Sequence, residues 1–312
     1  MSSRTRRALP YVAFVALALI WGFSFFFIKI GVADWSPSAL VLLRASSGAL
    51  ALVVFTKIAR VPLLGPEWRR RVLPFAIMAV INGLLPWTAI AWGEEHITSG
   101  LASILNATAT LWTAILVFWI VPAERPSRVN YVGVLIGIAG VAVLVLPDIQ
   151  KYGLSGSVAG IGAVILASFS YGVAAVFQRT RLRGMNLYQQ SLGQMLALSV
   201  LAFPVAAPSL PRVHLALGSI LAIVALGVFC TAIALLLYYY VMNALGAVRA
   251  TAVTLVVPVT AVFWGALLLR ETVTLPMIAG MVVILVGIVL TNLRRSPRRA
   301  APAEREAETA AA

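Results

Sequence analysis

Apolar residues in this sequence form long runs, which short segments of charged, proline and glycine residues separate. A helix that crosses a bilayer needs about 20 consecutive apolar residues, whereas a strand of an outer-membrane barrel shows about 10 residues of alternating polarity. The runs match the first pattern, so we expect an all-α membrane protein with ten transmembrane helices. These helices are expected near residues 11–30, 38–56, 72–93, 99–120, 130–146, 158–177, 187–207, 216–241, 250–269 and 274–293.

The second half of the chain repeats the first half in altered form. The stretch 246–287 resembles the stretch 98–140, and glycines recur in register, with Gly133 matched by Gly280. Five helices per half is an odd number, so the second half enters the membrane from the opposite side and the repeats are inverted. We expect a first repeat over residues 10–146, a second repeat over 158–293 and a disordered cytoplasmic tail over 294–312.

Composition supports a membrane protein and argues against several enzyme classes. Of the 312 residues, 61% are hydrophobic and only 11% are charged, with a mean hydropathy of +0.98. The sequence has one cysteine, Cys230, and two histidines, and it contains neither a zinc-protease motif nor a pair of intramembrane aspartates. We therefore expect neither an enzyme nor a protein with a cofactor or a metal centre.

The positive charges are distributed unequally between the two sides of the predicted membrane span. A formal net charge of +14 would suggest a nucleic-acid partner in a soluble protein. If the N-terminus is cytoplasmic, however, 19 of the 24 lysines and arginines lie on the cytoplasmic side and four on the other, with Arg44 inside a helix. This asymmetry predicts a multi-pass protein of the cell inner membrane with both termini in the cytoplasm, and no nucleic-acid partner.

Several motifs resemble the drug/metabolite transporter superfamily, EamA type. They are Trp21-Gly22-x-Ser24 with Lys29, Arg44, the segment Ser99-Gly100-Leu101-Ala102-Ser103, Pro258, and Leu269-Arg270-Glu271 before a glycine-spaced last helix. The first half departs from the pattern at Thr110, where a proline is usual, and at Pro122-Ala123-Glu124, where Leu-Gly-Glu is usual. The resemblance implies a ten-helix exporter of small metabolites, often amino acids, with helices 1, 3, 4, 6, 8 and 9 around a central cavity. Aromatic amino acid exporters are among the relatives it suggests.

Polar and aromatic side chains on otherwise apolar helices are the candidates for substrate binding. Ser103, Asn106 and Thr110 follow one face of the fourth helix, and Thr254 is the repeat equivalent of Asn106. Such side chains either line a cavity or form hydrogen bonds between helices, and both interpretations stay open. Trp21 and Tyr171 occupy matching positions in the two repeats. The complete set of candidates is Trp21, Asn82, Trp87, Ser103, Asn106, Thr110, Tyr171, Tyr239 and Thr254.

Prolines inside the helices and charges near their ends suggest structural roles. Pro86 and Pro258 each remove a backbone donor, so each is a candidate hinge. We expect Arg44 to form a structural ion pair with Asp34, Glu94 or Glu95, and Glu124 and Glu271 to cap helices 5 and 10, which they precede. Glu94, Glu95 and His96 are the grouped candidates for proton coupling, but they are expected to be solvated at the outer end of helix 3.

Together these features predict a secondary transporter that exports small metabolites by alternating access. The alternative is a membrane sensor or scaffold that has the same fold but performs no net transport. Gly133, Gly137 and Gly140 form a small-residue face on helix 5, for which packing inside one subunit is favoured over a dimer interface. We therefore expect a monomer, with a dimer as the alternative, whose partners are lipid and a small-molecule substrate.

Overall fold

The computed structural model describes residues 3–63, 65, 68–120, 128–152, 156–182, 185–245 and 253–292, and these residues are helical apart from short connections. The first half contains five spanning helices, of which the third and fourth consist of more than one element. The elements are α1 (Ser3–Gly31), α2 (Pro37–Ile58), α3 (Trp68–Ala79), the π-helical segment η1 (Val80–Leu84), α4 (Leu85–His96), α5 (Ser99–Ala107), α6 (Ala109–Ile120) and α7 (Arg128–Tyr152).

The second half has the same number of spanning helices within the described residues. Its elements are α8 (Gly156–Arg181), α9 (Leu187–Ala206), the 3₁₀ turn η2 (Leu210–Arg212), α10 (Leu217–Gly227), the π-helical segment η3 (Val228–Ile233), α11 (Ala234–Leu245), α13 (Val253–Leu268) and α14 (Leu275–Asn292). The all-helical fold with ten helices is thus confirmed. Six of these helices are long and apolar enough to cross a membrane: Ala8–Gly31, Pro37–Ile58, Trp68–His96, Ser99–Leu116, Ser157–Gln178 and Leu217–Tyr238.

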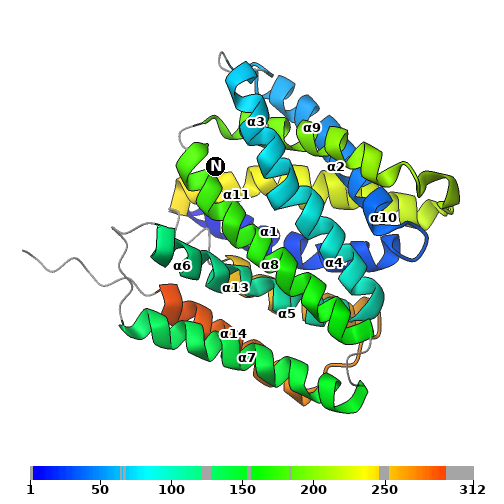
Figure 1. Cartoon of the computed structure of the whole chain (residues 1–312). Coiled ribbons are helices and arrows are strands. Elements are labelled where there is room, and N and C mark those ends of the chain that lie inside the picture. The colour runs from blue at the N-terminus through cyan, green and yellow to red at the C-terminus, as the bar shows by residue number, and fades with distance from the viewer. Residues whose placement is uncertain are drawn as a thin grey trace, which may run out of the picture.

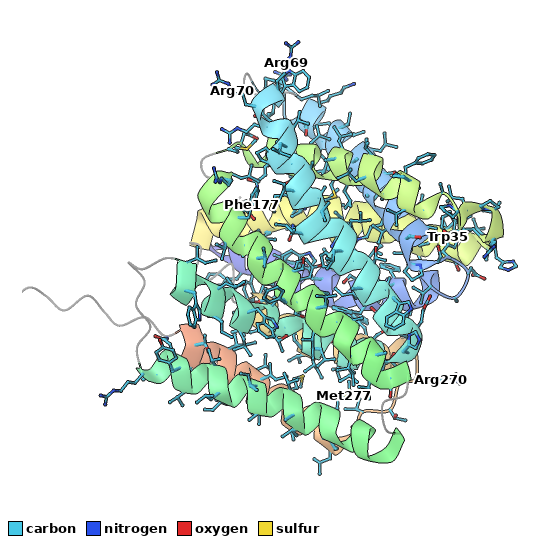
Figure 2. All side chains as sticks on the ribbon, viewed as in Figure 1. Trp35, Arg69, Arg70, Phe177, Arg270 and Met277 are labelled. Carbon is cyan, nitrogen blue, oxygen red and sulfur yellow. The ribbon has the colours of Figure 1, made fainter. Side chains whose placement is uncertain are left out.

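The helices lie side by side in one bundle, with α7 and α14 paired at one edge (Figure 1). Figure 2 shows Arg69 and Arg70 at one end of the bundle, whereas Trp35 and Arg270 lie at the opposite end. Large apolar side chains such as Leu135 and Val200 are exposed on the outside of the bundle, as expected where lipid surrounds it. The two ends of the bundle therefore correspond to the two faces of a membrane.

Equivalent helices of the two halves pack against each other. α2 contacts α9, α5 contacts α13, and α7 contacts α14. The contact between α7 and α14 depends on glycine: a Cβ atom on Gly287 would lie 2.5 Å from the Gly137 nitrogen, and one on Gly140 would lie 2.8 Å from the Ile284 nitrogen. The small-residue face of helix 5 thus packs within the chain, as the sequence indicates.

The glycines that follow Trp21 and Tyr171 also make equivalent contacts in the two halves. A Cβ atom on Gly22 would lie 2.9 Å from the Ala261 nitrogen in α13, and one on Gly172 would lie 2.9 Å from the Trp112 Cβ in α6. Helix 1 therefore packs closely on helix 9, and helix 6 on helix 4. The largest apolar cluster lies where the halves meet, and its buried members come from both: Phe25, Leu105, Val164, Leu226, Val257 and Ile284.

Candidate functional site

Two π-helical segments interrupt the third and eighth helices at equivalent positions. Val80, which begins η1, corresponds to Val228, which begins η3, 148 residues later. Pro86 follows η1 closely and has no N–H for the carbonyl group four residues earlier, that of Asn82, so the predicted hinge coincides with an interruption. At the other predicted hinge, α13 continues through Pro258 as one helix. Single-turn π segments within α-helices often occur at functional sites.

Arg44 lies inside the bundle beside η3. Only 8% of its surface is exposed, its Nε donates a hydrogen bond to the Thr231 Oγ1 at 3.1 Å, and its Cζ lies 3.6 Å from the ring centroid of Trp87. The close approach of α2 to α10 places it there, because a Cβ atom on Gly227 would lie 2.5 Å from the Arg44 carbonyl oxygen. Glycine at this position therefore permits the contact.

The ion pair predicted for Arg44 is not formed. Among the described residues its side chain contacts a hydroxyl group and an aromatic ring rather than a carboxylate. Asp34 instead accepts a hydrogen bond from Ser219, and Glu94 accepts one from Ser99. Each of these carboxylates is held by a serine, and no carboxylate of the described residues contacts the guanidinium.

The candidate aromatic residues lie on neighbouring parts of the core. Trp21 and Tyr171 both pack against the largest apolar cluster, and Tyr171 also packs against the adjacent cluster that contains Trp87. Trp21 stacks at a tilt on Tyr238, with ring centroids 5.6 Å apart. Of the predicted aromatic residues, Trp87 is the one in contact with Arg44, and Tyr171 packs against the cluster that contains Trp87.

The polar residues of the fourth helix differ in how their hydrogen bonds are satisfied. The Ser103 hydroxyl donates to the Gly100 carbonyl oxygen of its own helix at 2.7 Å, which favours a structural role. The Asn106 Oδ1 is buried and has no partner, and the helix is interrupted at Thr108, just after it. Thr110 is half-buried in α6. Asn106 is thus the member of the stripe with an unused acceptor.

The remaining candidates are placed less completely. Asn82 is half-buried in η1, and Thr254 is half-buried in the first turn of α13. The expected approach of Asn106 to Thr254 stays a prediction. Glu124 lies outside the described residues, and only the backbone of Tyr239 is described.

A group of charged residues at the end of α4 corrects a further expectation. Glu94 is fully buried, at 0% exposure, although Glu95 and His96 are exposed as predicted. Its Oε2 accepts a hydrogen bond from the Ser99 hydroxyl at 2.7 Å, while its Oε1 has no partner. Lys29 donates to the backbone oxygens of Glu94 and Ile97. Glu94 lies on the side of α4 that faces the rest of the bundle, so the expected solvation of this carboxylate was wrong.

Glu271 caps a different helix from the one predicted. Its two oxygens accept hydrogen bonds from the backbone nitrogens of Ser99, at 2.8 Å, and Gly100, at 3.1 Å. These two nitrogens begin α5, whereas α14 begins only at Leu275. A carboxylate from the second repeat thus stabilises the positive end of a first-repeat helix. The sequence does not identify this contact because the residues are 171 or 172 positions apart.

Sequence reasoning also missed the residues that hold the charged groups. The Thr231 hydroxyl accepts a hydrogen bond from Arg44, and the Ser99 hydroxyl donates one to Glu94. Neither residue stands out in the sequence by its type. The available signal was repeat position, since Thr231 falls in η3 at the place where η1 contains Gly83. A polar residue in one repeat where the other has glycine marks a local difference between the halves.

Comparisons with known proteins identify the same two-repeat organisation. The EamA-like transporter family matches residues 8–146 and 158–293. The transporter YoaV of Bacillus subtilis is 23% identical over 91% of this chain and 97% of its own length. The inner membrane transporter YedA of Escherichia coli K12 is 28% identical over 93% of both chains, and a transporter of Archaeoglobus fulgidus is 29% identical over 90% of this chain and 99% of its own.

A solved crystal structure of a protein that is 18% identical has the same fold, with a TM-score of 0.66 over 91% of this chain and 96% of that chain. The curated relatives are named as transporters rather than as enzymes. With its apolar helices, the chain is a multi-pass membrane protein. Because the family covers both halves, the chain belongs to the EamA-like transporter family, and it is a membrane transporter.

Proposed function

We propose that this transporter exports small metabolites, amino acids among them, across the inner membrane by alternating access. The observation that carries the proposal is the pair of π-helical segments η1 and η3, which interrupt equivalent helices in the two halves. In secondary transporters, helices that are interrupted near the middle of the membrane supply substrate contacts from backbone groups, and equivalent elements of inverted repeats exchange roles between the two states.

The candidate residues described above suit a small amphipathic metabolite. Asn106 offers a buried amide oxygen without a partner, while Trp21, Trp87 and Tyr171 supply flat apolar faces. Transport by this route needs no covalent chemistry, because the substrate is bound and released unchanged. Export of aromatic amino acids is the finer form of this proposal.

The first test is flux through the purified protein in liposomes. Vesicles are loaded with an unlabelled amino acid, and counterflow is measured as uptake of the labelled amino acid from outside. We expect saturable uptake that empty liposomes lack. Binding without any flux would contradict the proposal and favour a sensor or scaffold.

Asn106→Leu then tests the site itself, because leucine has the branched shape and the number of heavy atoms of asparagine but lacks its hydrogen-bonding groups. A bound polar group left unpaired costs about 1–3 kcal/mol, so the apparent affinity should fall roughly five- to a hundredfold while the protein still folds. Ser103→Ala is the matched control, since its hydroxyl is satisfied within its own helix. Unchanged affinity in Asn106→Leu would place the substrate elsewhere.

A further inference from the structure

Arg44 differs from the other charged groups inside the bundle in having donors that the protein does not use. Its Nε is bonded to Thr231, and neither terminal nitrogen has a hydrogen-bond partner among the described residues. The buried atoms without a partner include the Glu94 Oε1 and the Asn106 Oδ1 but neither terminal nitrogen of Arg44. Those nitrogens are therefore donors that the described part of the protein leaves unused.

The guanidinium is also fixed in orientation. The ring of Trp87 lies under it at 3.6 Å, and the bond to Thr231 holds its third nitrogen. A planar guanidinium held in this way presents its two terminal nitrogens as a fork, which matches the two oxygens of a carboxylate. Snorkelling to the lipid surface does not account for Arg44, because its side chain is packed inside the protein.

We propose that Arg44, held by Trp87 and Thr231, binds the carboxylate of the transported substrate. This inference rests on the proposed transport function and specifies its substrate class as monocarboxylates with an apolar body. An arginine without an acidic partner inside a membrane protein is costly, and a bound anion supplies the missing charge.

The electrostatic surroundings favour one negative charge rather than two. A dianionic phosphate would be only partly neutralised by a single arginine, whereas a monocarboxylate matches its one positive charge. The ring of Trp87 lies beside the guanidinium, and Tyr171 packs against the apolar cluster that contains Trp87. A carboxylate attached to an aromatic or aliphatic group therefore fits both parts of the site.

The test compares acids with their neutral amides. Full-length protein in detergent micelles is titrated by calorimetry with phenylacetate and phenylacetamide, and with L-phenylalanine and L-phenylalaninamide. Each pair has nearly the same shape and differs in the carboxylate. We expect at least one acid to bind about tenfold or more tightly than its amide. The proposal is overturned if neither acid binds more tightly than its amide, or if inorganic phosphate competes as well as phenylacetate.

Variants then assign the effect to Arg44. Arg44→Met should weaken binding of the acid about ten- to a hundredfold and leave binding of the amide unchanged, and Arg44→Lys, which keeps the charge but loses the fork, should fall between Met and the original residue. Arg212→Met, at an exposed arginine in η2, is the matched control and should bind as the original protein does. Equal losses for acid and amide in Arg44→Met would overturn the assignment.

Thr231→Val keeps the proposal testable if Arg44→Met does not fold. It removes the acceptor of the Nε hydrogen bond without removing the charge, so the acid should lose several-fold in affinity and the amide none. Failure of this inference is distinguishable from failure of transport. If Arg44→Met still transports and keeps its selectivity for acids, only the carboxylate site is overturned. If acid binding depends on Arg44 but the protein shows no flux, only the transport function is overturned.

Discussion

Glu94 carries a carboxylate with no exposed surface, and only one of its oxygens has a hydrogen-bond partner. The donor is the Ser99 hydroxyl, which lies five residues later at the start of α5. A buried charged group depends strongly on such a bond, since the loss of a partner exposes the full cost of its desolvation. Ser99 is therefore expected to matter more for stability than an ordinary helix serine.

Ser99→Ala should lower the free energy of unfolding by about 1–3 kcal/mol, because both Glu94 oxygens then lack a side-chain donor. The measurement is unfolding of the purified protein in mixed micelles. Ser199→Ala is the control, since its hydroxyl bonds only to the Met195 carbonyl oxygen of its own helix. In a Glu94→Gln background the loss from Ser99→Ala should shrink, and equal losses in both backgrounds would contradict the role given to Ser99.

At the scale of residues, the sequence identified the charged side chains of interest but did not predict their burial or their contacts. Glu94, Glu95 and His96 are adjacent and look alike, yet only Glu94 is buried, because burial depends on which side of the helix faces the rest of the bundle. Arg44 stands out in the sequence by its depth, about two turns inside α2, but the ion pair predicted for it is not formed among the described residues. Its partners could not be predicted, since Thr231 lies 187 residues away.

At the scale of elements, α5 is capped from both repeats. The Thr98 hydroxyl accepts a hydrogen bond from the Leu101 nitrogen at 3.3 Å, and Glu271 accepts from the two nitrogens before it. Thr98 belongs to the same segment, whereas Glu271 connects the start of α5 to the turn that leads into α14. The second cap therefore fixes the relation between two helices as well as the end of one.

Glu271→Ala should cost about 0.5–2 kcal/mol, the usual loss for a helix cap. Hydrogen exchange followed by mass spectrometry should show faster exchange both in the peptide over residues 97–107 and in the peptide around 269–274. Thr98→Ala is the comparison, and it should accelerate exchange only in the first peptide, because it leaves Glu271 bound to Ser99. Acceleration confined to the first peptide in Glu271→Ala would argue that the cap is merely local.

The element boundaries were well predicted because run length and turn residues determine where a spanning helix starts and stops. Pro37 and Ser36 begin α2, and Thr98 begins α5, as ordinary capping rules indicate. The π-helical segments were not predicted, because one extra residue in a helical turn does not change the apolar character of the run from which a spanning helix is recognised. Pro86 marked the site of η1, but η3 has no proline within it.

At the scale of the whole molecule, the orientation in the membrane is the expectation still to be measured. In a cysteine-free background, Cys230→Ala, single cysteines are placed by Ser2→Cys and Ala312→Cys. With both termini cytoplasmic, an impermeant thiol reagent should label neither position in intact cells and both after lysis. Labelling from outside at both positions would reverse the assigned orientation, and labelling at only one would contradict an even number of spans.

The glycine contact between α7 and α14 joins helices that belong to different repeats. With backbone atoms in direct apposition at Gly137 and Gly287, neither helix can slide along the other without a clash. We therefore expect the pair to move together during transport. In that case the boundary between the repeats, at residues 146–158, does not divide the protein into two independently moving parts, and a moving part contains helices from both repeats.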